Sequence, residues 1–579
     1  MIRRLHACLF ALLALSPLVA SAEENQNARW SLERSDLATW DVMVGIDEEG
    51  APGTPRPRGL SPALFGYQID GSGTASIPAS DVEGIVYDLA LKAPLGRVWR
   101  GRKLNMAIRY DRLLDHHPVD VALSGKVVEV KGDTFRLEGK AIGIPDPPDE
   151  KLGPSPIKWI THLSIKFEIV FDTKRGVMES AVLRLRSSSR KKAAVVGEKP
   201  PDPVDRALRF RFKLRRVRRH EPGWKFDIDV GKAVQKGTTY LRQMIQEGGT
   251  YGAYSVFPHG ETCLVTLTLL TCGVDRDDPF IIRLMEKIRS YQPTTTYEIG
   301  IALMAMEAFH APTGNGGRRR TTKGACGKQN GDLEWMRGLT RRLASIAEKK
   351  PEGWGWGYTK ETSRADLSNT QYAALGLLAA WRCGIGISEE VWVGLARGVL
   401  RHRTLKEKHL LHIRRVGGRD KATVVPKLTT ARGYAYVPGG PTATASMTCA
   451  AVSSLQIVHD VLRANRSRHL AEEIGSDIQE GIEQGWAWLA GHWSIQSHAP
   501  EFNGKWLLYY LYGLERAGVF SRVAKLNGHD WYYEGAAWLV DSQETNGRWQ
   551  DLAPEIHNTC FALLFLKRGT IPVVTGAGK

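Results

Sequence analysis

The chain has 579 residues, more than the ~250–300 that one hydrophobic core supports, so we expect more than one domain. After residue 22 no apolar run reaches the ~18 residues that a membrane span needs, which excludes a transmembrane segment. The formal net charge is +17, and eight basic residues lie between Arg206 and Arg219. No aromatic stacking motif accompanies these cations, so nucleic acid is excluded as the partner.

Residues 1–22 have the pattern of a cleavable secretory signal peptide. Arg3 and Arg4 precede an apolar run from Ala7 to Leu15, and small residues end at Ala22, after which we expect cleavage. The mature chain is therefore expected to be secreted or periplasmic. Residues 23–64 are polar and rich in Gly and Pro towards their end, which predicts a flexible arm.

Residues 65–225 alternate between apolar and polar side chains, which predicts an antiparallel β domain with one packed face and one solvated face. The clearest strands are expected over residues 126–130, 134–142, 162–171, 178–186 and 207–217. In the last of these, Arg209, Arg211 and Lys213 alternate with two phenylalanines. The basic face over Arg206–Arg219 is either simply solvated or contacts an anionic surface of the cell envelope.

Residues 228–570 alternate between two kinds of helix. Amphipathic, charged helices are expected over about 229–246, 278–290, 332–348, 388–403, 477–492 and 529–543, and apolar helices over about 260–272, 295–310, 366–383, 442–463, 503–517 and 556–567. The first kind can face water, whereas the second belongs inside. Strict alternation of these pairs predicts a closed (α/α)6 toroid, because an open solenoid would need polar capping repeats that neither end has. The fold class is therefore α+β and multidomain, with residues 571–579 as a tail.

A segment near the C-terminus carries a family resemblance. It runs Gly535-Ala-Ala-Trp538-Leu539, then Gln543, then Gly547-Arg-Trp549. This pattern resembles the QW repeat of squalene-hopene and oxidosqualene cyclases. An imperfect copy lies at Tyr240-Leu241, Gln246 and Gly249-Thr-Tyr251, and a weaker one at Trp488-Leu489. The resemblance covers about residues 228–570 and implies a terpenoid cyclase and protein prenyltransferase-like toroid.

Within the repeat, Gly547 ends the helix because a left-handed turn costs glycine nothing. Gln543 has the donors needed to tie the helix end to the backbone of the next segment.

Aromatic, glycine-rich loops connect each amphipathic helix to the following apolar one, and we expect them to surround the mouth of a cavity. The aromatic residues expected to bind a ligand there are Tyr251, Trp354, Trp356, Tyr434, Tyr436 and Trp549. Polar residues begin the apolar helices, and the candidates for catalysis among them are Glu261, Glu298, Asp366 and His557. The alternative is that such residues only cap their helices. The clustered helix N-termini would favour an anionic or polarisable ligand, and the aromatic walls a hydrophobic one.

Three other motifs are assigned to structure and not to chemistry. Asp275-Arg-Asp277-Asp278 spells the acid motif of squalene-hopene cyclases, but it follows an apolar helix, and Asp278-Pro279 reads as an N-cap followed by proline. Prenyltransferases bind zinc through Asp, Cys and His, but their ligand order is not reproduced by Asp366, His557 and Cys560.

The adjacent histidines of Asp115-His-His have no third ligand nearby, so no metal ligand and no cofactor are assigned.

Five of the six cysteines of the mature chain lie in apolar helical runs, where we interpret them as buried core residues without disulfides: Cys263, Cys272, Cys383, Cys449 and Cys560. Cys326 lies in a Gly- and Arg-rich loop and is expected to be an exposed thiol.

Two functions fit these observations. One is a binding or scaffold protein of the cell envelope, which is favoured because no general acid of the cyclase family's kind lies at the mouth. The other is a terpenoid cyclase-like enzyme or lyase acting on a hydrophobic or polymeric substrate, whose aromatic cavity would stabilise developing positive charge.

Overall fold

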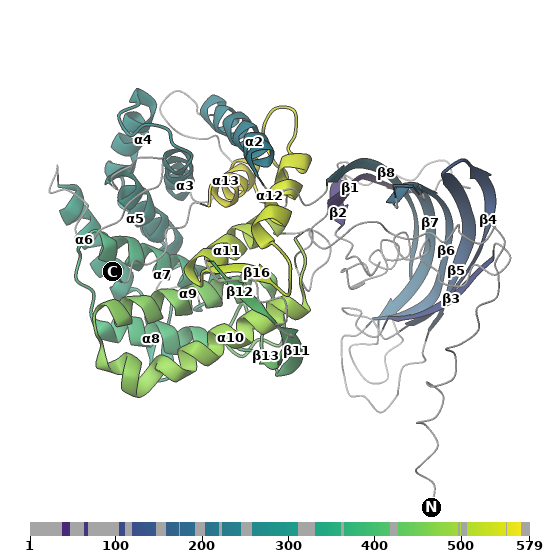
Figure 1. Cartoon of the computed structure of the whole chain (residues 1–579). Coiled ribbons are helices and arrows are strands. Elements are labelled where there is room, and N and C mark those ends of the chain that lie inside the picture. The colour runs from purple at the N-terminus through teal and green to yellow at the C-terminus, as the bar shows by residue number, and fades with distance from the viewer. Residues whose placement is uncertain are drawn as a thin grey trace, which may run out of the picture.

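The computed structural model consists of a β-sheet followed by a helical region (Figure 1). The structure describes residues 37–46, 63–67, 103–110, 119–145, 158–172, 174–175, 177–191, 203–218, 223–244, 258–310, 331–359, 364–416, 427–495, 498, 506–551 and 553–568. The expected signal peptide, Asp115-His-His, Tyr251, Cys326 and the tail 571–579 lie outside these residues.

The sheet is antiparallel and strongly curved, with the strand order β2-β1-β8-β7-β6-β5-β4-β3 (Figure 1). Its strands are β1 (Leu37–Ile46), β2 (Ala63–Tyr67), β3 (Lys103–Tyr110), β4 (Val119–Lys131), β5 (Thr134–Pro145), β6 (Lys158–Asp172), β7 (Val177–Lys191) and β8 (Val204–Arg218). Strands β4 to β8 lie where the alternation predicts them. The prediction of an arm up to residue 64 is wrong for Leu37–Ile46, because this segment pairs with β8 along its whole length.

The two faces of the sheet differ in charge, as the alternation predicts. Phe210 and Phe212 are buried on one face, whereas Arg211 and Lys213 are exposed on the other. Cations also stand directly opposite one another across four neighbouring strands: Arg209 pairs with Arg184, Arg184 with Lys166, and Lys166 with Lys140. Like charges in direct cross-strand pairs repel and destabilise a sheet. We call these four residues the basic row.

The described part of the chain has twelve α-helices after the sheet, at the positions that the helical patterns predict. The amphipathic set is α2 (Trp224–Gln243), α4 (Pro279–Arg289), α6 (Asp332–Ser345), α8 (Glu389–Leu400), α10 (Gly475–Gly491) and α12 (Trp531–Ser542). The apolar set is α3 (Pro258–Thr271), α5 (Thr296–His310), α7 (Leu367–Arg382), α9 (Ala445–Ala464), α11 (Leu507–Phe520) and α13 (Glu555–Leu566).

Short strands lie between the helices: β9 (Glu348–Lys350), β10 (Gly353–Gly355), β11 (Glu407–Leu411), β12 (Ile413–Arg415), β13 (Lys427–Ala431), β14 (Tyr434–Ala435), β15 (Ala443–Thr444) and β16 (Val523–Leu526). A π-helical turn, Leu470–Ile474, precedes α10. None of the helices in the described ranges combines the length and apolarity that crossing a bilayer requires.

The apolar helices contact one another in chain order. Each of α3, α5, α7, α9 and α11 packs against the next of the set, and α13 packs against both α11 and α3. The first and last amphipathic helices, α2 and α12, are also in contact. Every residue of α7 but Ser368 is buried, because its surface is covered by neighbours on all sides.

One aromatic anchor recurs in three of these helix pairs. Trp356, Tyr434 and Trp549 are almost fully buried, and they precede the apolar helices α7, α9 and α13 by 11, 11 and 6 residues. The backbone N–H of each donates to a threonine Oγ1 in that helix, at 3.0 Å to Thr370, 3.1 Å to Thr448 and 3.4 Å to Thr559. Each threonine hydroxyl in turn donates to the carbonyl four residues earlier, at 2.7 to 2.8 Å.

The polar tip of each anchor is also satisfied. The indole Nε1 of Trp356 donates to the Leu343 carbonyl and that of Trp549 to the Leu539 carbonyl, both at 2.8 Å, so each bonds near the end of the preceding amphipathic helix. The Tyr434 hydroxyl donates to the Gly481 carbonyl at 3.0 Å. The three aromatic residues therefore join helices, which accounts for their regular place in the repeat.

Gln543 makes the contacts expected of the QW-like segment and one more. Its Nε2 donates to the Gly547 carbonyl at 2.9 Å, as predicted, and also to the Ala233 carbonyl in α2 at 2.9 Å. Gly547 has a φ of +95°, and a Cβ there would lie 2.5 Å from the Lys236 carbonyl oxygen. The turn after α12 thus fits against the first helix only because residue 547 is glycine.

The prediction of buried cysteines without disulfides is confirmed for three residues, confirmed in part for Cys272 and wrong for Cys383. Cys263, Cys449 and Cys560 are buried and Cys272 is half-buried; none of the four is in a disulfide, and all lie in or beside apolar helices. Cys383 is disulfide-bonded. Its apolar surroundings predicted a free core residue, but burial of a cysteine does not report which segment the tertiary fold brings beside it.

Candidate ligand-binding cavity

A cavity of about 510 Å³ lies at the N-terminal ends of the apolar helices. Five of these helices, α5, α7, α9, α11 and α13, contribute to it together with the loops before them. Its lining in the described ranges is Tyr297, Tyr358, Ser368, Asn369, Tyr372, Tyr436, Thr444, Ser446, Met447, His498, Trp506, Tyr509, Ala553, Pro554, His557 and Phe561. This volume is within the range of small-molecule sites.

Two of the sequence-predicted residues line this cavity, Tyr436 and His557. The structure does not bring the other described aromatic candidates to it: Trp354 is buried against Gly394 and Gly398, and Trp356, Tyr434 and Trp549 are the helix anchors described above. Glycine-rich aromatic loops therefore predicted the location of the cavity better than they predicted its lining.

Asp366 stands behind the cavity wall, as the N-cap of α7. Its carboxylate accepts from the Asn369 backbone N–H at 2.8 Å and from Asn369 Nδ2 at 2.9 Å. The Tyr436 side chain also bonds to it. Burial is the largest influence on this carboxyl group and raises its pKa, although the hydrogen bonds act in the opposite direction. Asp366 therefore caps its helix, as the alternative to a catalytic role predicted, and it also holds the Tyr436 side chain in place.

Glu261 and Glu298 are both buried in the first turns of α3 and α5, outside the cavity lining. The Glu298 carboxylate accepts from the Thr295 hydroxyl at 3.1 Å, and the Glu298 backbone N–H donates to that hydroxyl at 3.3 Å. This reciprocal contact at a helix start is a capping arrangement. Glu261 lies close enough to Tyr297 and Cys560 to influence the pKa of each.

His557 lies on the cavity wall in the first turn of α13. Its Nδ1 atom is buried and has no hydrogen-bond partner among the described residues. Burial lowers the pKa of His557 to about 4, so the ring is neutral near pH 7.

His498 is a lining residue that sequence reasoning missed. Its Nε2 accepts from the Ser446 backbone N–H at 3.1 Å and lies 2.9 Å from Ser446 Oγ, in the first turn of α9. Because the backbone can only donate, Nε2 carries the lone pair and the neutral ring is protonated at Nδ1. That Nδ1 is buried and lacks a described partner. Burial lowers the pKa of His498 to about 4.

This Ser446–His498 pair resembles part of a nucleophile–base arrangement, but two features oppose that role. A base with a pKa of about 4 accepts a proton poorly near pH 7, and no described acceptor orients Nδ1. The imidazole does satisfy an orphan N–H at the start of α9, which is a capping role.

A buried cation lies behind two of the lining tyrosines. Arg516 in α11 is 1% exposed, and neither Nη1 nor Nη2 has a hydrogen-bond partner in the described residues. Its guanidinium carbon lies 3.3 Å from the centre of the Tyr512 ring and interacts electrostatically with Tyr372 and Tyr509. Burial lowers the Arg516 pKa to about 10, so the group remains charged near pH 7.

Two of the missed lining residues had a signal in the sequence. Tyr372 and Phe561 occupy the same position in the near copies Asn369-Thr-Gln-Tyr and Asn558-Thr-Cys-Phe. Because His557 was predicted to face the cavity, the equivalent positions of the two helices could also have been predicted to face it. His498 and Trp506 come from the loop before α11, where no periodicity indicates direction.

Comparison of the sequence with protein-family models and with curated proteins finds no match.

Proposed function

We propose that this chain is an exported binding protein whose helical region is an (α/α)6 toroid like that of terpenoid cyclases and protein prenyltransferases. The proposed ligand is amphipathic, with an apolar isoprenoid or ring body and an anionic end. The observation that carries the proposal is a tyrosine-lined cavity with a buried, positively charged Arg516 behind its wall.

The toroid is supported by the order of helix contacts. The apolar helices contact one another from α3 to α13, and α13 returns to α3, while α12 returns to α2. The three aromatic–threonine anchors and the Gln543 bond to Ala233 support the resemblance to the QW repeat. The aromatic–threonine contacts recur in three helix pairs, as contacts do in repeat architectures.

The chemistry of the ligand follows from the lining. Tyr297, Tyr372 and Phe561 offer apolar ring surface, and none of the described lining residues is acidic. A buried guanidinium without a carboxylate partner is energetically costly, so an anionic group near Tyr372 and Tyr509 would be stabilised. The N-termini of the surrounding helices add positive electrostatic potential to that of the guanidinium.

Binding is favoured over catalysis because three of the polar groups at or near the cavity already make structural contacts at helix starts. Asp366 and Glu298 have capping contacts, and His498 accepts from the start of α9. The alternative, an enzyme of the cyclase or lyase kind, draws support from one arrangement. Tyr436 lines the cavity and bonds to Asp366 and Tyr358, and burial raises the pKa of both Asp366 and Tyr436. A neutral carboxyl group there would be a proton donor.

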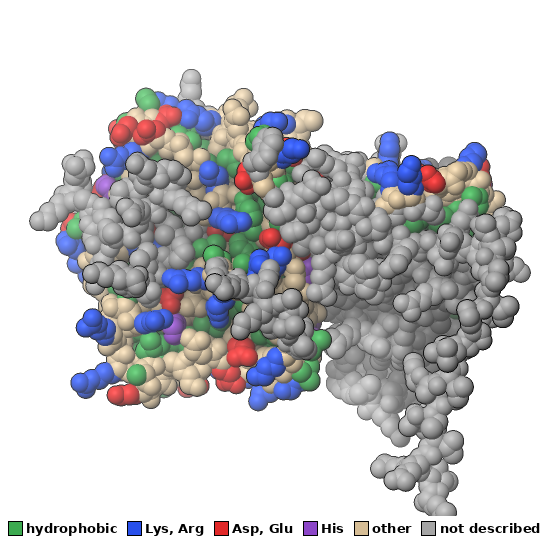
Figure 2. Space-filling model, viewed as in Figure 1, with side chains coloured by type: hydrophobic (Ala, Val, Ile, Leu, Met, Phe, Trp, Pro, Cys, Tyr) green, Lys and Arg blue, Asp and Glu red, His purple; other side chains and the backbone are tan. Residues whose placement is uncertain are grey.

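Export and an envelope partner are supported by two further features. The disulfide at Cys383 is typical of oxidising compartments. The basic row on the sheet would be stabilised by an anionic partner, because its cross-strand cations repel one another. Figure 2 shows Lys and Arg side chains over the helical region, mixed with acidic ones, and further basic side chains on the visible part of the sheet with a few acidic ones beside them.

The experiment is equilibrium binding of a C15 isoprenoid carboxylate, the matching uncharged alcohol and an acidic glycan, with recovery of each ligand to detect turnover. We expect the carboxylate to bind at least 10-fold more tightly than the alcohol, and Arg516→Gln to abolish that preference. Arg276→Gln, at an exposed position, is the matched control and should leave the preference unchanged. Equal binding of acid and alcohol by the wild-type chain would refute the anionic end.

The alternative function predicts that the wild-type chain converts one of these ligands. If Tyr436→Phe or Glu298→Gln abolishes that conversion while binding is unchanged, the protein is an enzyme and not only a binding protein. His557→Ala tests the wall of the cavity in the same assay, since it should weaken binding of acid and alcohol alike.

The basic row is tested by vesicle binding. We expect the protein to sediment with phosphatidylglycerol vesicles but not with phosphatidylcholine vesicles. The double variant Lys140→Gln/Lys166→Gln should weaken this binding, whereas Lys131→Gln should not.

A further inference from the structure

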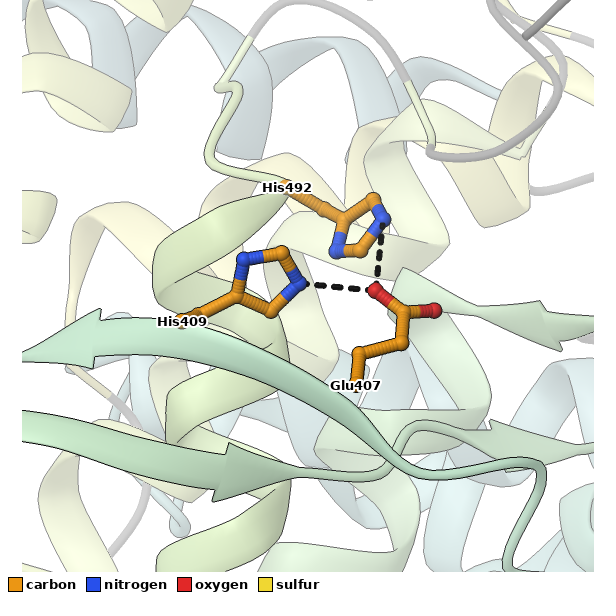
Figure 3. Close-up of side chains that lie close together, drawn as sticks. All are labelled: Glu407, His409 and His492. Atoms are coloured by element: carbon orange, nitrogen blue, oxygen red, sulfur yellow. Dashed lines mark hydrogen bonds and ion pairs between the residues drawn. The ribbon is translucent and has the colours of Figure 1, made fainter. Parts of the chain in front are cut away.

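Three possible metal ligands meet where strand β11 passes the end of helix α10 (Figure 3). Glu407 and His409 are two residues apart in β11, so their side chains point to the same face of the strand. Pairing with β13 fixes this register, with Glu407 opposite Ala431 and His409 opposite Thr429. His492 follows directly after the last residue of α10.

The ligand atoms of these residues converge. The Nε2 atom of His409 lies 2.7 Å from Glu407 Oε2, and that of His492 lies 3.8 Å from the same oxygen. All three atoms are within 4.8 Å of one another. Zinc bonds of 2.0–2.1 Å in a tetrahedron separate neighbouring ligand atoms by about 3.3 Å, so small side-chain shifts would produce that geometry.

His492 is held as a ligand before any ion binds. Its Nδ1 lies 2.9 Å from the Trp488 carbonyl, and its ring stacks on the Trp488 indole at a centroid distance of 4.1 Å. Because a carbonyl only accepts, Nδ1 carries the proton, and the neutral ring therefore presents a lone pair at Nε2. A histidine fixed through its other nitrogen by a carbonyl is the usual support of a metal-binding histidine.

Without an ion, the 2.7 Å contact is a hydrogen bond in which His409 Nε2–H donates to the Glu407 carboxylate, and zinc would take the place of that proton. His492 Nε2 faces the same oxygen, so one cation can contact both imidazoles and the carboxylate. The space for the second imidazole depends on Gly491, since a Cβ there would lie 2.4 Å from Nδ1 of His409.

We propose that Glu407, His409 and His492 bind a zinc ion that links β11 to the end of α10. Two imidazoles and one carboxylate leave a fourth position for water or an exogenous ligand, as in zinc sites with three protein ligands. None of the three residues is among the described lining of the tyrosine cavity, so this site is separate from the proposed function.

The test is calorimetric titration of zinc into the tag-free full-length protein after treatment with a chelator. One zinc ion should bind per chain, and Co²⁺ in its place should give the intense visible absorption of a four-coordinate site. His409→Asn and His492→Asn should each weaken zinc binding by more than the ~10–100-fold typical of lost outer-shell support. Gly491→Ala keeps all three ligands and should weaken binding by displacing the His409 ring.

His469→Asn is the matched control, because His469 also contacts a single glutamate, Glu473, at 2.6 Å, without a second histidine in the cluster. It should bind zinc like the wild-type chain. Circular dichroism establishes that each variant is folded. Unchanged zinc affinity in His409→Asn and His492→Asn would overturn the proposal, as would a wild-type cobalt spectrum of six-coordinate form.

Discussion

At the scale of single residues, Asp278 shows how position decides the role of a motif. It belongs to a cluster that spells a cyclase acid motif, yet its carboxylate accepts from the Phe280 backbone N–H at 2.8 Å and proline follows it. Arg242 also donates to it at 2.9 Å. These partners hold the pKa of Asp278 below its usual value, with the backbone bond as the largest cause. The predicted N-cap is confirmed.

We expect Asp278→Ala to lower the free energy of unfolding by ~1 kcal/mol, the usual cost of losing an N-cap. Asp277→Ala is the control, because the Asp277 side chain is 82% exposed, and its effect should stay within ~0.5 kcal/mol. Urea unfolding measures both. Equal losses in the two variants would show that general charge, and not capping, accounts for the effect.

Residue roles near the cavity were harder to predict than the helices. The Gly-rich loops around Trp356, Tyr434 and Trp549 look like cavity loops, but the Nε1 or hydroxyl group of each finds a backbone carbonyl inside the helix packing. His498 reaches Ser446 across 52 residues of sequence, and no local pattern reports such a contact. Two of the candidates for catalysis, Asp366 and Glu298, make the capping contacts that the alternative interpretation predicted.

At the scale of elements, periodicity predicted the twelve described helices and the strands β4 to β8, because burial of one face imposes a regular pattern. It failed for β1, where the polar flanks of Leu37–Ile46 masked a short alternating segment. Which helices contact one another, and whether Cys383 forms a disulfide, depend on tertiary proximity. The spacing of residues along the chain does not encode that proximity.

The repeated anchors lead to a graded prediction for these elements. Thr370→Val and Thr448→Val each leave a buried backbone N–H without its acceptor, which costs ~1–3 kcal/mol of unfolding free energy. Thr559→Val should cost less, because its contact with the Trp549 N–H is longer, 3.4 Å against 3.0 and 3.1 Å.

Thr239→Val in α2 is the control, since that exposed hydroxyl bonds only to the carbonyl four residues before it. Chemical denaturation of the four variants measures the loss of unfolding free energy in each, which should be larger for Thr370→Val and Thr448→Val than for Thr559→Val and smallest for Thr239→Val. A loss in Thr239→Val as large as that in Thr370→Val would contradict the structural role of the anchors.

At the scale of the whole molecule, three histidines couple stability to pH. Burial is the main cause that lowers the pKa of His402, His498 and His557 to about 4 in the folded protein. The unfolded chain protonates them below ~6.5, whereas the folded protein does so only near 4. The contribution of these histidines to stability is therefore constant above ~6.5 and is lost as the pH drops towards 4, by at most ~1.4 kcal/mol per pH unit for each histidine.

His498→Gln removes one of these titrations, so its unfolding free energy should fall less steeply than that of the wild type between pH 6.5 and 4. The slope is the readout, because the substitution also changes the absolute stability. His469→Gln, at a half-exposed position, should keep the wild-type slope. Parallel curves for wild type and His498→Gln would show that His498 titrates normally in the folded protein.

The return of the last helices to the first also constrains how the molecule is made. Gln543 bonds to Ala233 across 310 residues, and α13 packs against α3. A nascent chain thus carries α3 with one apolar side uncovered until residues 555–566 have left the ribosome. Such late, long-range contacts slow folding, and a premature stop anywhere before α13 would leave that side exposed to chaperones and proteases.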